Sequence, residues 1–358
     1  MGHEVIIVGA GIIGASIARA LGQRGADVLV VDQGLPAQGA SGRSFGWVNA
    51  SFYHDLHHHR LRAASMRLWD EHLDSLPQDS AIFRGALLWD VPPTEQTKMV
   101  AELGAQNYPA TAVTADRLRA MVPGMADLPD MAVFLQSEGA VDSAAVTRAW
   151  LAQSGARLLT GLNVLGLRQS SGRITGIDTE TGPIEAAQVV VAAGTQTQAL
   201  LASVDVQLPM LRRPGLLMAT RPVAHCTEYV LVPPFGEVRQ DAQGRLIAST
   251  VAGHQGDATE LVTGSPEDHG LATLAKLQAL FPNVPLELES VSHALRPVPQ
   301  DGLPAIGPIG PRGLFAATLH SGVTLAPIVG HLLADEMAGQ PQDTWLAPYR
   351  PTRFEPAD

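Results

Sequence analysis

The chain is poor in cysteine and in lysine. Cys226 is the only cysteine among the 358 residues, which excludes an internal disulfide and any CxxC metal or redox pair. This usage fits a reducing compartment, and we expect the protein to be cytoplasmic. Lys98 and Lys276 are the only lysines among 24 basic residues. Few positions can therefore supply an ammonium group that would promote the reduction of oxygen.

Basic charge is scarce as well. The formal net charge is -11 and no basic stripe is visible, so neither nucleic acid nor an anionic membrane surface is an expected partner. Hydrophobic residues make up 46% of the chain and charged residues 16%, a balance that is too apolar for a disordered protein. The length allows about two domains.

The N-terminal segment predicts a strand, a glycine turn and a helix rather than a membrane span. The apolar stretch from Val5 to Leu21 lacks a basic leader and carries three glycines and Arg19. Val5–Val8 fits a buried strand, residues 12 to about 24 fit a helix, and Val28–Val31 fits the next strand. Together they indicate a βαβ unit of a parallel sheet, and no membrane span is expected.

The turn of this unit is a GxGxxG motif, Gly9-Ala10-Gly11-Ile12-Ile13-Gly14. Its first glycine permits the tight turn, the second lets the backbone approach a pyrophosphate, and the third lets helix and strand pack closely. Asp32 ends the second strand, where its carboxylate can accept hydrogen bonds from an adenosine ribose. The motif predicts a dinucleotide site but does not separate FAD from NAD.

Three further segments carry a resemblance. Residues 39–47 form a small, polar loop that suits a phosphate or the edge of an isoalloxazine ring. Residues 295–308 read LRPVPQDGLPAIGP, and residues 319–327 read LHSGVTLAP. With the N-terminal unit, these segments resemble the superfamily of D-amino-acid oxidase, glycine oxidase and sarcosine oxidase over nearly the whole chain. The resemblance implies an FAD-dependent oxidoreductase.

The resemblance also assigns roles to two residues and one helix. Arg296, in the RPxxxDGLPxIG-like stretch, is expected to bind a substrate carboxylate with its bidentate fork. His320 is expected beside the cofactor. The helix after Gly322 is expected to aim its positive end at the flavin pyrimidine, where flavin reduction places negative charge.

The pattern predicts a mixed fold, α/β plus α+β. A Rossmann-like FAD-binding domain is assigned to residues 1–80, 141–203 and 296–358, and an antiparallel-sheet substrate domain to residues 81–140 and 204–295. The predicted FAD-binding domain includes a capped helix over Ser143–Gln153, a β-meander, and a strand over Val189–Val191 that returns to the first sheet. The meander is predicted from four segments, Arg157–Leu159, Val164–Arg168, Ile174–Asp178 and Ile184–Ala186.

The candidate site residues follow from these motifs. Arg296, Arg239 and His320 are the candidate catalytic residues. The candidate FAD-binding residues lie in the glycine turns, the polar loop, the meander and the C-terminal motif: Gly9, Ala10, Gly11, Ile12, Ile13, Gly14, Asp32, Gln33, Ser41, Gly42, Arg43, Ser44, Gly46, Trp47, Val164, Ala193, Gly194, Ser321, Gly322, Val323 and Thr324.

The chain departs from parts of the family pattern. Some relatives attach the flavin through a cysteine ahead of the arginine motif, whereas residues 292–295 contain none, so FAD should bind non-covalently. Some relatives place a tyrosine where this chain reads Glu237-Val238-Arg239-Gln240, and plain glycine or sarcosine is therefore not the expected substrate. Sarcosine oxidases have a lysine that promotes oxygen reduction. Lys98, expected just before a surface helix, and Lys276, expected within one, are not obvious equivalents.

A histidine cluster raises the question of a metal. His54 and His58 are four residues apart, a spacing that can place two imidazoles on one helix face, and His57 and His59 lie beside them. No acidic or cysteine partner completes a recognisable set. We expect these histidines to be exposed to solvent or to lie in a loop beside the flavin, and we expect no bound metal.

The leading prediction is oxidation of the C-N bond of an amino acid or related amine, with hydride transfer to the flavin and hydrolysis of the imine. Oxidation of a 2-hydroxy acid is the alternative, and it would need a base such as a histidine. A nicotinamide-linked dehydrogenase, and a flavin-bearing subunit of a heteromeric dehydrogenase, remain open. The partners expected are a small substrate and oxygen or another electron acceptor, and the chain can form a homo- or hetero-oligomer.

Overall fold

The computed structural model describes residues 2–250 and 260–355. Residue 1, residues 251–259 and residues 356–358, which belong to three of the predicted domain segments, lie outside the described part. The helices are α1 (Ile12–Gly22), α2 (Leu56–His72), α3 (Pro93–Ala105), α4 (Ala115–Met121), α5 (Ser143–Gln153), α6 (Thr197–Ala202), α7 (Pro266–Leu280), α8 (Gly322–Met337) and α9 (Asp343–Leu346). None of the helices within the described ranges is both long and apolar enough to cross a membrane.

The first sheet is built around parallel strands in the order expected of a dinucleotide-binding fold. Its strands are β1 (His3–Val8), β2 (Val28–Asp32), β9 (Arg157–Thr160), β10 (Val164–Ser170), β11 (Arg173–Thr179), β12 (Gly182–Val191), β18 (Ala305–Pro308) and β19 (Leu314–Thr318). The parallel part runs β9-β2-β1-β12-β19. Strand order therefore reverses between β1 and β12, and such a switch point is where ligands bind in open α/β sheets.

Both faces of this sheet are covered. Val5, Ile7, Val28 and Val30 belong to the core that also holds residues of α1, α5 and α8. The alternating residues Ile6, Val8, Leu29 and Val31 face a second core with residues of α6 and the meander. The βαβ unit predicted at the N-terminus is confirmed in position and in the parallel pairing of its strands.

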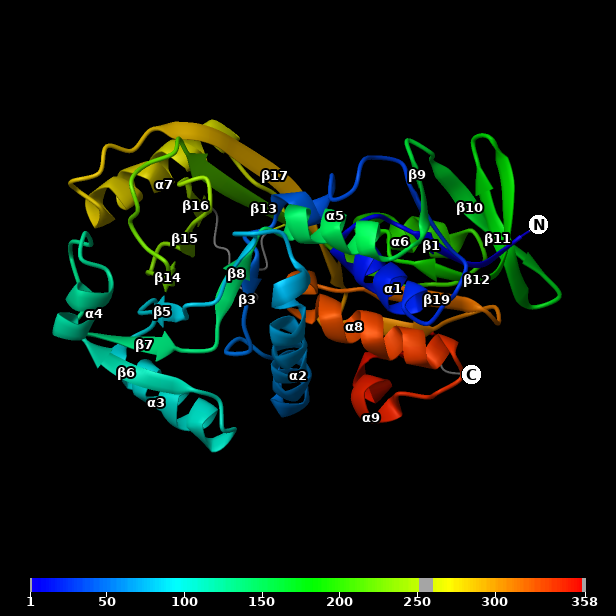
Figure 1. The fold of residues 1–358 in the computed structure, drawn as a ribbon, viewed down its shortest axis with the longest axis horizontal. Helices are drawn as coiled ribbons and strands as arrows, with labels where there is room; N and C mark the ends of the chain where they lie inside the picture. Colours follow the sequence, from blue (N-terminus) through cyan, green and yellow to red (C-terminus); the bar gives the residue numbers. More distant parts are fainter. Residues whose placement is uncertain (1, 251–259, 356–358) are drawn as a thin grey trace.

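The second sheet joins the two separated halves of the predicted substrate domain. Its order is β17-β13-β16-β15-β14-β5-β7-β6, and its strands are β5 (Ala86–Leu88), β6 (Ala110–Thr114), β7 (Met131–Leu135), β13 (Met210–Thr220), β14 (Val230–Val232), β15 (Val238–Gln240), β16 (Leu246–Ser249) and β17 (Leu288–Pro299). Every pair is antiparallel except β14 with β5, which joins the two halves. Figure 1 shows β13 and β17 extending from this sheet toward the first one.

A small sheet lies between the two large ones. Its strands are β3 (Trp47–Val48), β4 (Ala81–Ile82) and β8 (Gly139–Val141), in the order β3-β8-β4. Strand β3 follows the polar loop, and it pairs with β8, which in turn pairs with β4. The small sheet therefore joins the polar loop to the start and the end of the predicted segment 81–140. The mixed fold class is confirmed, and the division into two domains stays a prediction.

Three strand predictions need correction. Arg157–Thr160 pairs in parallel with β2, so β9 is an edge strand of the first sheet and no part of the meander. Ile184–Ala186 and Val189–Val191 form one strand, β12, because the residues between them contain no turn former; β12 changes partner from β11 to β1 along its length. The strand β17 was not predicted, since two prolines near its end obscure the pattern, and the predicted boundary at residue 296 falls inside it.

Candidate active site

A cavity of about 1040 Å³ lies at the carboxyl ends of the parallel strands. Its floor includes the residues that follow β1, β2, β12 and β19, and its roof includes β13 and β17. Pockets for small ligands measure roughly 300 to 1,000 Å³, so this cavity suits a dinucleotide together with a substrate. The topology thus places one large site at the switch point of the sheet.

The glycine turn is shaped by two close approaches. Gly9 has φ +116°, and a Cβ there would come within 2.4 Å of the carbonyl oxygen of Ala192. A Cβ on Gly14 would lie 1.9 Å from the carbonyl oxygen of Gly9. The first glycine is therefore needed for the turn, and the third for packing of α1 against β1. Residues 9–13 line the cavity, whereas Gly14 does not, so a contact between Gly14 and the cofactor stays a prediction.

Asp32 holds the turn in place. Its Oδ2 accepts a hydrogen bond from the backbone N–H of Ala10 at 2.7 Å, and its Oδ1 accepts one from the N–H of Gly34 at 2.7 Å. Asp32 and Gln33 both line the cavity. Because each carboxylate oxygen has two lone pairs, Asp32 can still accept a hydrogen bond from a ribose.

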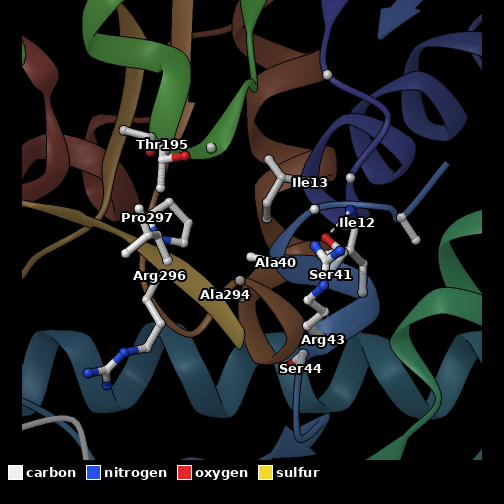
Figure 2. A pocket seen from close by; sticks show the side chains of 18 of the residues that line it. Ile12, Ile13, Ala40, Ser41, Arg43, Ser44, Thr195, Ala294, Arg296 and Pro297 are labelled. Carbon is white, nitrogen blue, oxygen red and sulfur yellow. Dashed lines mark hydrogen bonds between the residues drawn. The ribbon is translucent and has the colours of Figure 1, made fainter. Parts of the chain in front are cut away.

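The polar loop closes the same end of the cavity (Figure 2). Ser41, Arg43, Ser44, and also Gly46 and Trp47, line it. The Oγ of Ser41 accepts a hydrogen bond from the N–H of Ile12 at 3.0 Å, which joins the loop to the N-terminus of α1. Gly42 instead lines a neighbouring cavity of about 440 Å³, and its contact with FAD stays a prediction.

The predicted C-terminal motif and the meander form further parts of the cavity lining. Ser321, Gly322, Val323 and Thr324, at the start of α8, line the cavity, as do Val164, Ala193 and Gly194. Ser321 has a left-handed backbone with φ 58°, which turns the chain into the helix. The N-terminus of α8 therefore opens on the cavity, and its position beside the flavin stays a prediction.

Arg296 projects from β17 into the cavity region. Its Nε donates to the carbonyl of Arg213 at 3.4 Å, and its Nη2 donates to that of Pro214 at 3.3 Å. Figure 2 shows its guanidinium extending to the side of the cavity away from Ser41 and Arg43. The arginine is thus separated from the glycine turn by the width of the site.

His320 also lines the cavity, half-buried in its wall. Its Nδ1 lies 3.2 Å from the Oγ of Ser321. Enclosure in the wall, together with the positive charges of Arg296 and Arg62, lowers the pKa of His320 to about 3. The imidazole is therefore neutral at physiological pH.

Arg239 is not in the large cavity. Its Nε donates to the carbonyl of Phe45 at 2.6 Å, its guanidinium lies 5.7 Å from the centroid of the Phe45 ring, and the side chain lines the smaller neighbouring cavity. Arg239 therefore lies beside the neighbouring cavity, and its catalytic role stays a prediction. Burial lowers its pKa.

The histidine cluster also differs from its prediction. His58 and His59 are buried in α2, whereas His54 precedes the helix and is exposed. Burial lowers the pKa of His58 to about 2. Neither His58 nor His59 is solvated, and neither lines the large cavity. Across residues 2–250 and 260–355, no group of three or more histidine, cysteine, aspartate or glutamate side chains is arranged to hold a metal ion.

The two lysines lie away from the cavity. Lys98 lies within α3 rather than before it, and its Nζ is 3.6 Å from the Oε1 of Glu102. The Nζ of Lys276, in α7, is 5.9 Å from the centroid of the Phe235 ring. Neither residue is among those that line the large cavity.

Three residues of the cavity wall were not predicted from the sequence. Arg62, Asn49 and Glu237 line it, and all three are buried. A signal for Arg62 is present in α2: it lies three residues before Ser65 and seven before Trp69, on the helix face that is buried. A charged residue on a buried face indicates a polar partner or a site.

Comparison with known proteins identifies the cofactor. A family model described as FAD dependent oxidoreductase matches residues 4–336. The chain belongs to this family. It is 27% identical to a glycine oxidase of Pseudomonas aeruginosa over 373 residues, which cover 98% of this chain and 99% of the relative.

Two solved structures share its fold. Glycine oxidase from Geobacillus kaustophilus has a TM-score of 0.86 and 24% identity, with 99% of each chain covered. L-proline dehydrogenase from P. horikoshii has a TM-score of 0.86 and 22% identity, with 99% of this chain and 98% of that chain covered. The likeness extends over the whole architecture, including both large sheets.

The cavity fits FAD. The N-termini of α1 and α8 both open on it, and the positive end of a helix suits an anionic group such as a pyrophosphate or a reduced pyrimidine. Gly9 and Gly11 both line the cavity, and glycine at such a turn lets a pyrophosphate approach the backbone. FAD is therefore the cofactor, which decides the choice that the GxGxxG motif left open.

Proposed function

We propose that the protein oxidises the C-N bond of an amino acid or a related carboxylate-bearing amine. FAD, when bound, supplies the hydride acceptor. The observation that carries the proposal is the position of Arg296 on the wall of the same cavity as the glycine turn and the N-terminus of α8. The relatives named glycine oxidase and L-proline dehydrogenase support this class of substrate.

In this proposal Arg296 binds the substrate carboxylate. Its planar guanidinium can form two parallel hydrogen bonds to the two oxygens. That contact orients the substrate so that its Cα hydrogen faces the cofactor. Because Glu237 stands in the segment where some relatives place a tyrosine, the substrate is proposed to differ from plain glycine and sarcosine.

Oxidation of a 2-hydroxy acid remains the second candidate, and His320 argues against it. That reaction needs a base for the hydroxyl proton. His320 lines the cavity, but its pKa is lowered to about 3, which makes it a weak base. A neutral amine needs no such base, and the neutral imidazole can still accept a hydrogen bond from it.

The FAD contacts are proposed for the candidate residues that line the cavity. Residues 9–13, Asp32 and Gln33 would hold the nucleotide end, and residues 321–324 would lie beside the flavin. Attachment of FAD is proposed to be non-covalent.

The test is anaerobic reduction by a panel of amino acids, amines and 2-hydroxy acids, followed as bleaching of the flavin absorbance. We expect a carboxylate-bearing amine to bleach the flavin of the wild type and Arg296→Lys to slow this strongly. Arg213→Lys is the matched control, because Arg213 lies opposite Arg296 in the strand register and does not line the cavity. Bleaching by hydroxy acids alone would overturn the proposal.

A further inference from the structure

A fully buried arginine holds the side chain of an asparagine in the cavity wall. Arg62 in α2 is 0% exposed. Its Nε donates to the backbone carbonyl of Asn49 at 3.0 Å, and its Nη2 donates to the Oδ1 of Asn49 at 2.6 Å. The two bonds leave from one planar group, so they fix the backbone and the side chain of Asn49 together.

This contact decides which way the amide points. Arginine has only donors, so the atom of Asn49 that faces Arg62 must be the oxygen, and the NH₂ group must face the other way. Within the described residues, Nδ2 of Asn49 has no hydrogen-bond partner. Because Asn49 lines the large cavity, its NH₂ is a donor available to whatever fills that part of the cavity.

Asn49 lies beside the start of α8. Its backbone N–H donates to the Oγ1 of Thr324 at 3.3 Å, and this hydroxyl donates to the carbonyl of Trp47 at 3.2 Å. Thr324 is in the first turn of α8, whose N-terminus opens on the cavity. The amide of Asn49 is thus next to the helix end that suits a reduced pyrimidine.

We propose that Nδ2 of Asn49 donates a hydrogen bond to the flavin ring at the end next to α8, and that Arg62 is the positioning residue that fixes this donor. The proposal rests on FAD as the cofactor and is independent of the amine substrate. A donor at this position favours the reduced flavin, because reduction increases the negative charge on the pyrimidine.

The sharpest variant is Asn49→Asp. Aspartate has the same shape and keeps an oxygen facing Arg62, so the contact with the arginine is retained, but the cavity-facing donor becomes an acceptor. We expect the flavin midpoint potential to become more negative and the dissociation constant of FAD to rise about tenfold, the loss of roughly one hydrogen bond. Dye-coupled potentiometry and fluorescence titration of the apoprotein measure both.

Asn163→Asp is the charge control. Asn163 lines the same cavity beside Val164, in the meander rather than near α8, so it adds the same charge at the other end of the site. Its midpoint potential should match that of the wild type. Equal negative shifts in both variants would show that charge alone is responsible and would overturn the proposal.

Arg62→Lys tests the positioning step. Lysine keeps the charge but cannot form both contacts in one plane, so the amide of Asn49 loses its fixed orientation. We expect the potential to shift in the same direction as in Asn49→Asp, by a smaller amount. An unchanged potential and flavin spectrum in both variants would leave Asn49 a purely structural residue and would overturn the proposal.

Discussion

Ser16 on α1 lies directly against Gly330 on α8. The Oγ of Ser16 donates to the carbonyl of Ala326 at 2.6 Å, and a Cβ added at Gly330 would come within 2.3 Å of that Oγ. These two helices present their N-termini to the same cavity. The absence of a side chain at residue 330 therefore sets how closely the two ends approach.

Replacing Gly330 by alanine should destabilise the protein. The close backbone of Ser16 leaves no room for a methyl group, and overpacking of a buried contact costs about 1 to 3 kcal/mol. We expect a lower unfolding free energy and a reduced FAD content after purification, because the two helix ends must separate. Urea denaturation and the flavin absorbance measure the two effects.

Gly104→Ala is the control for this prediction. Gly104 lies in α3, and nothing is within 4 Å of a Cβ built there. Alanine in an open helical position favours the helix by about 0.5 to 1 kcal/mol. A Gly330→Ala protein as stable as the Gly104→Ala protein would contradict the close packing of α1 and α8.

Local patterns predicted much of the fold and of the cofactor end of the site. The glycine turn, Asp32 and the N-terminus of α8 could be predicted from a few adjacent residues, and residues 9–13, Asp32 and residues 322–324 all line the cavity. Their function depends on backbone shape within one turn, which the local sequence dictates.

Contacts between distant segments could not be predicted in this way. The position of Arg239 depends on which cavity its strand faces, and the contact between Arg62 and Asn49 depends on how α2 packs against β3. The partner of β9 depends on the order of strands in space. Each is settled by packing over the whole domain, so a local pattern carries no signal for it.

FAD should be released intact by acid. The segment before Arg296 contains no cysteine, and Cys226 is buried away from the lining of the cavity. Precipitation with acid should therefore leave the yellow chromophore in the supernatant, where chromatography identifies it as FAD. A pellet that keeps its colour would mean covalent attachment through another residue.

Glu138 should make stability fall as the pH rises. It is completely buried, its Oε1 accepts hydrogen bonds from the hydroxyl of Tyr108 and the N–H of Ser51, and burial raises its pKa to about 7. Between the unfolded pKa near 4.5 and the folded value, the native state binds more protons than the unfolded state. The unfolding free energy therefore decreases through this window and levels off above it.

Glu138→Gln should remove this dependence. Urea denaturation at pH 5 and pH 8 should show a loss of roughly 2 to 3 kcal/mol in the wild type that is absent from the variant. Glu102→Gln, at the exposed partner of Lys98, should behave as the wild type. Identical pH profiles for the wild type and Glu138→Gln would show that Glu138 does not titrate in this range.

Oxygen should be a poor electron acceptor compared with an artificial dye. The first electron transfer to oxygen produces a superoxide anion, which a cation close to the flavin stabilises. Lys98 and Lys276 lie outside the cavity lining, so no lysine can provide this charge. Arg43 and the N-terminus of α8, which both border the cavity, are the groups that would replace it.

Stopped-flow measurement of flavin reoxidation separates an oxidase from a dehydrogenase. The enzyme is reduced anaerobically by its substrate and then mixed with aerated buffer or with a dye, and the return of flavin absorbance is followed. We expect reoxidation by oxygen to lag far behind turnover with the dye, because superoxide formation lacks a lysine beside the flavin. If reoxidation by oxygen keeps pace with turnover, the protein is an oxidase, and Arg43→Gln then tests whether that arginine supplies the missing charge.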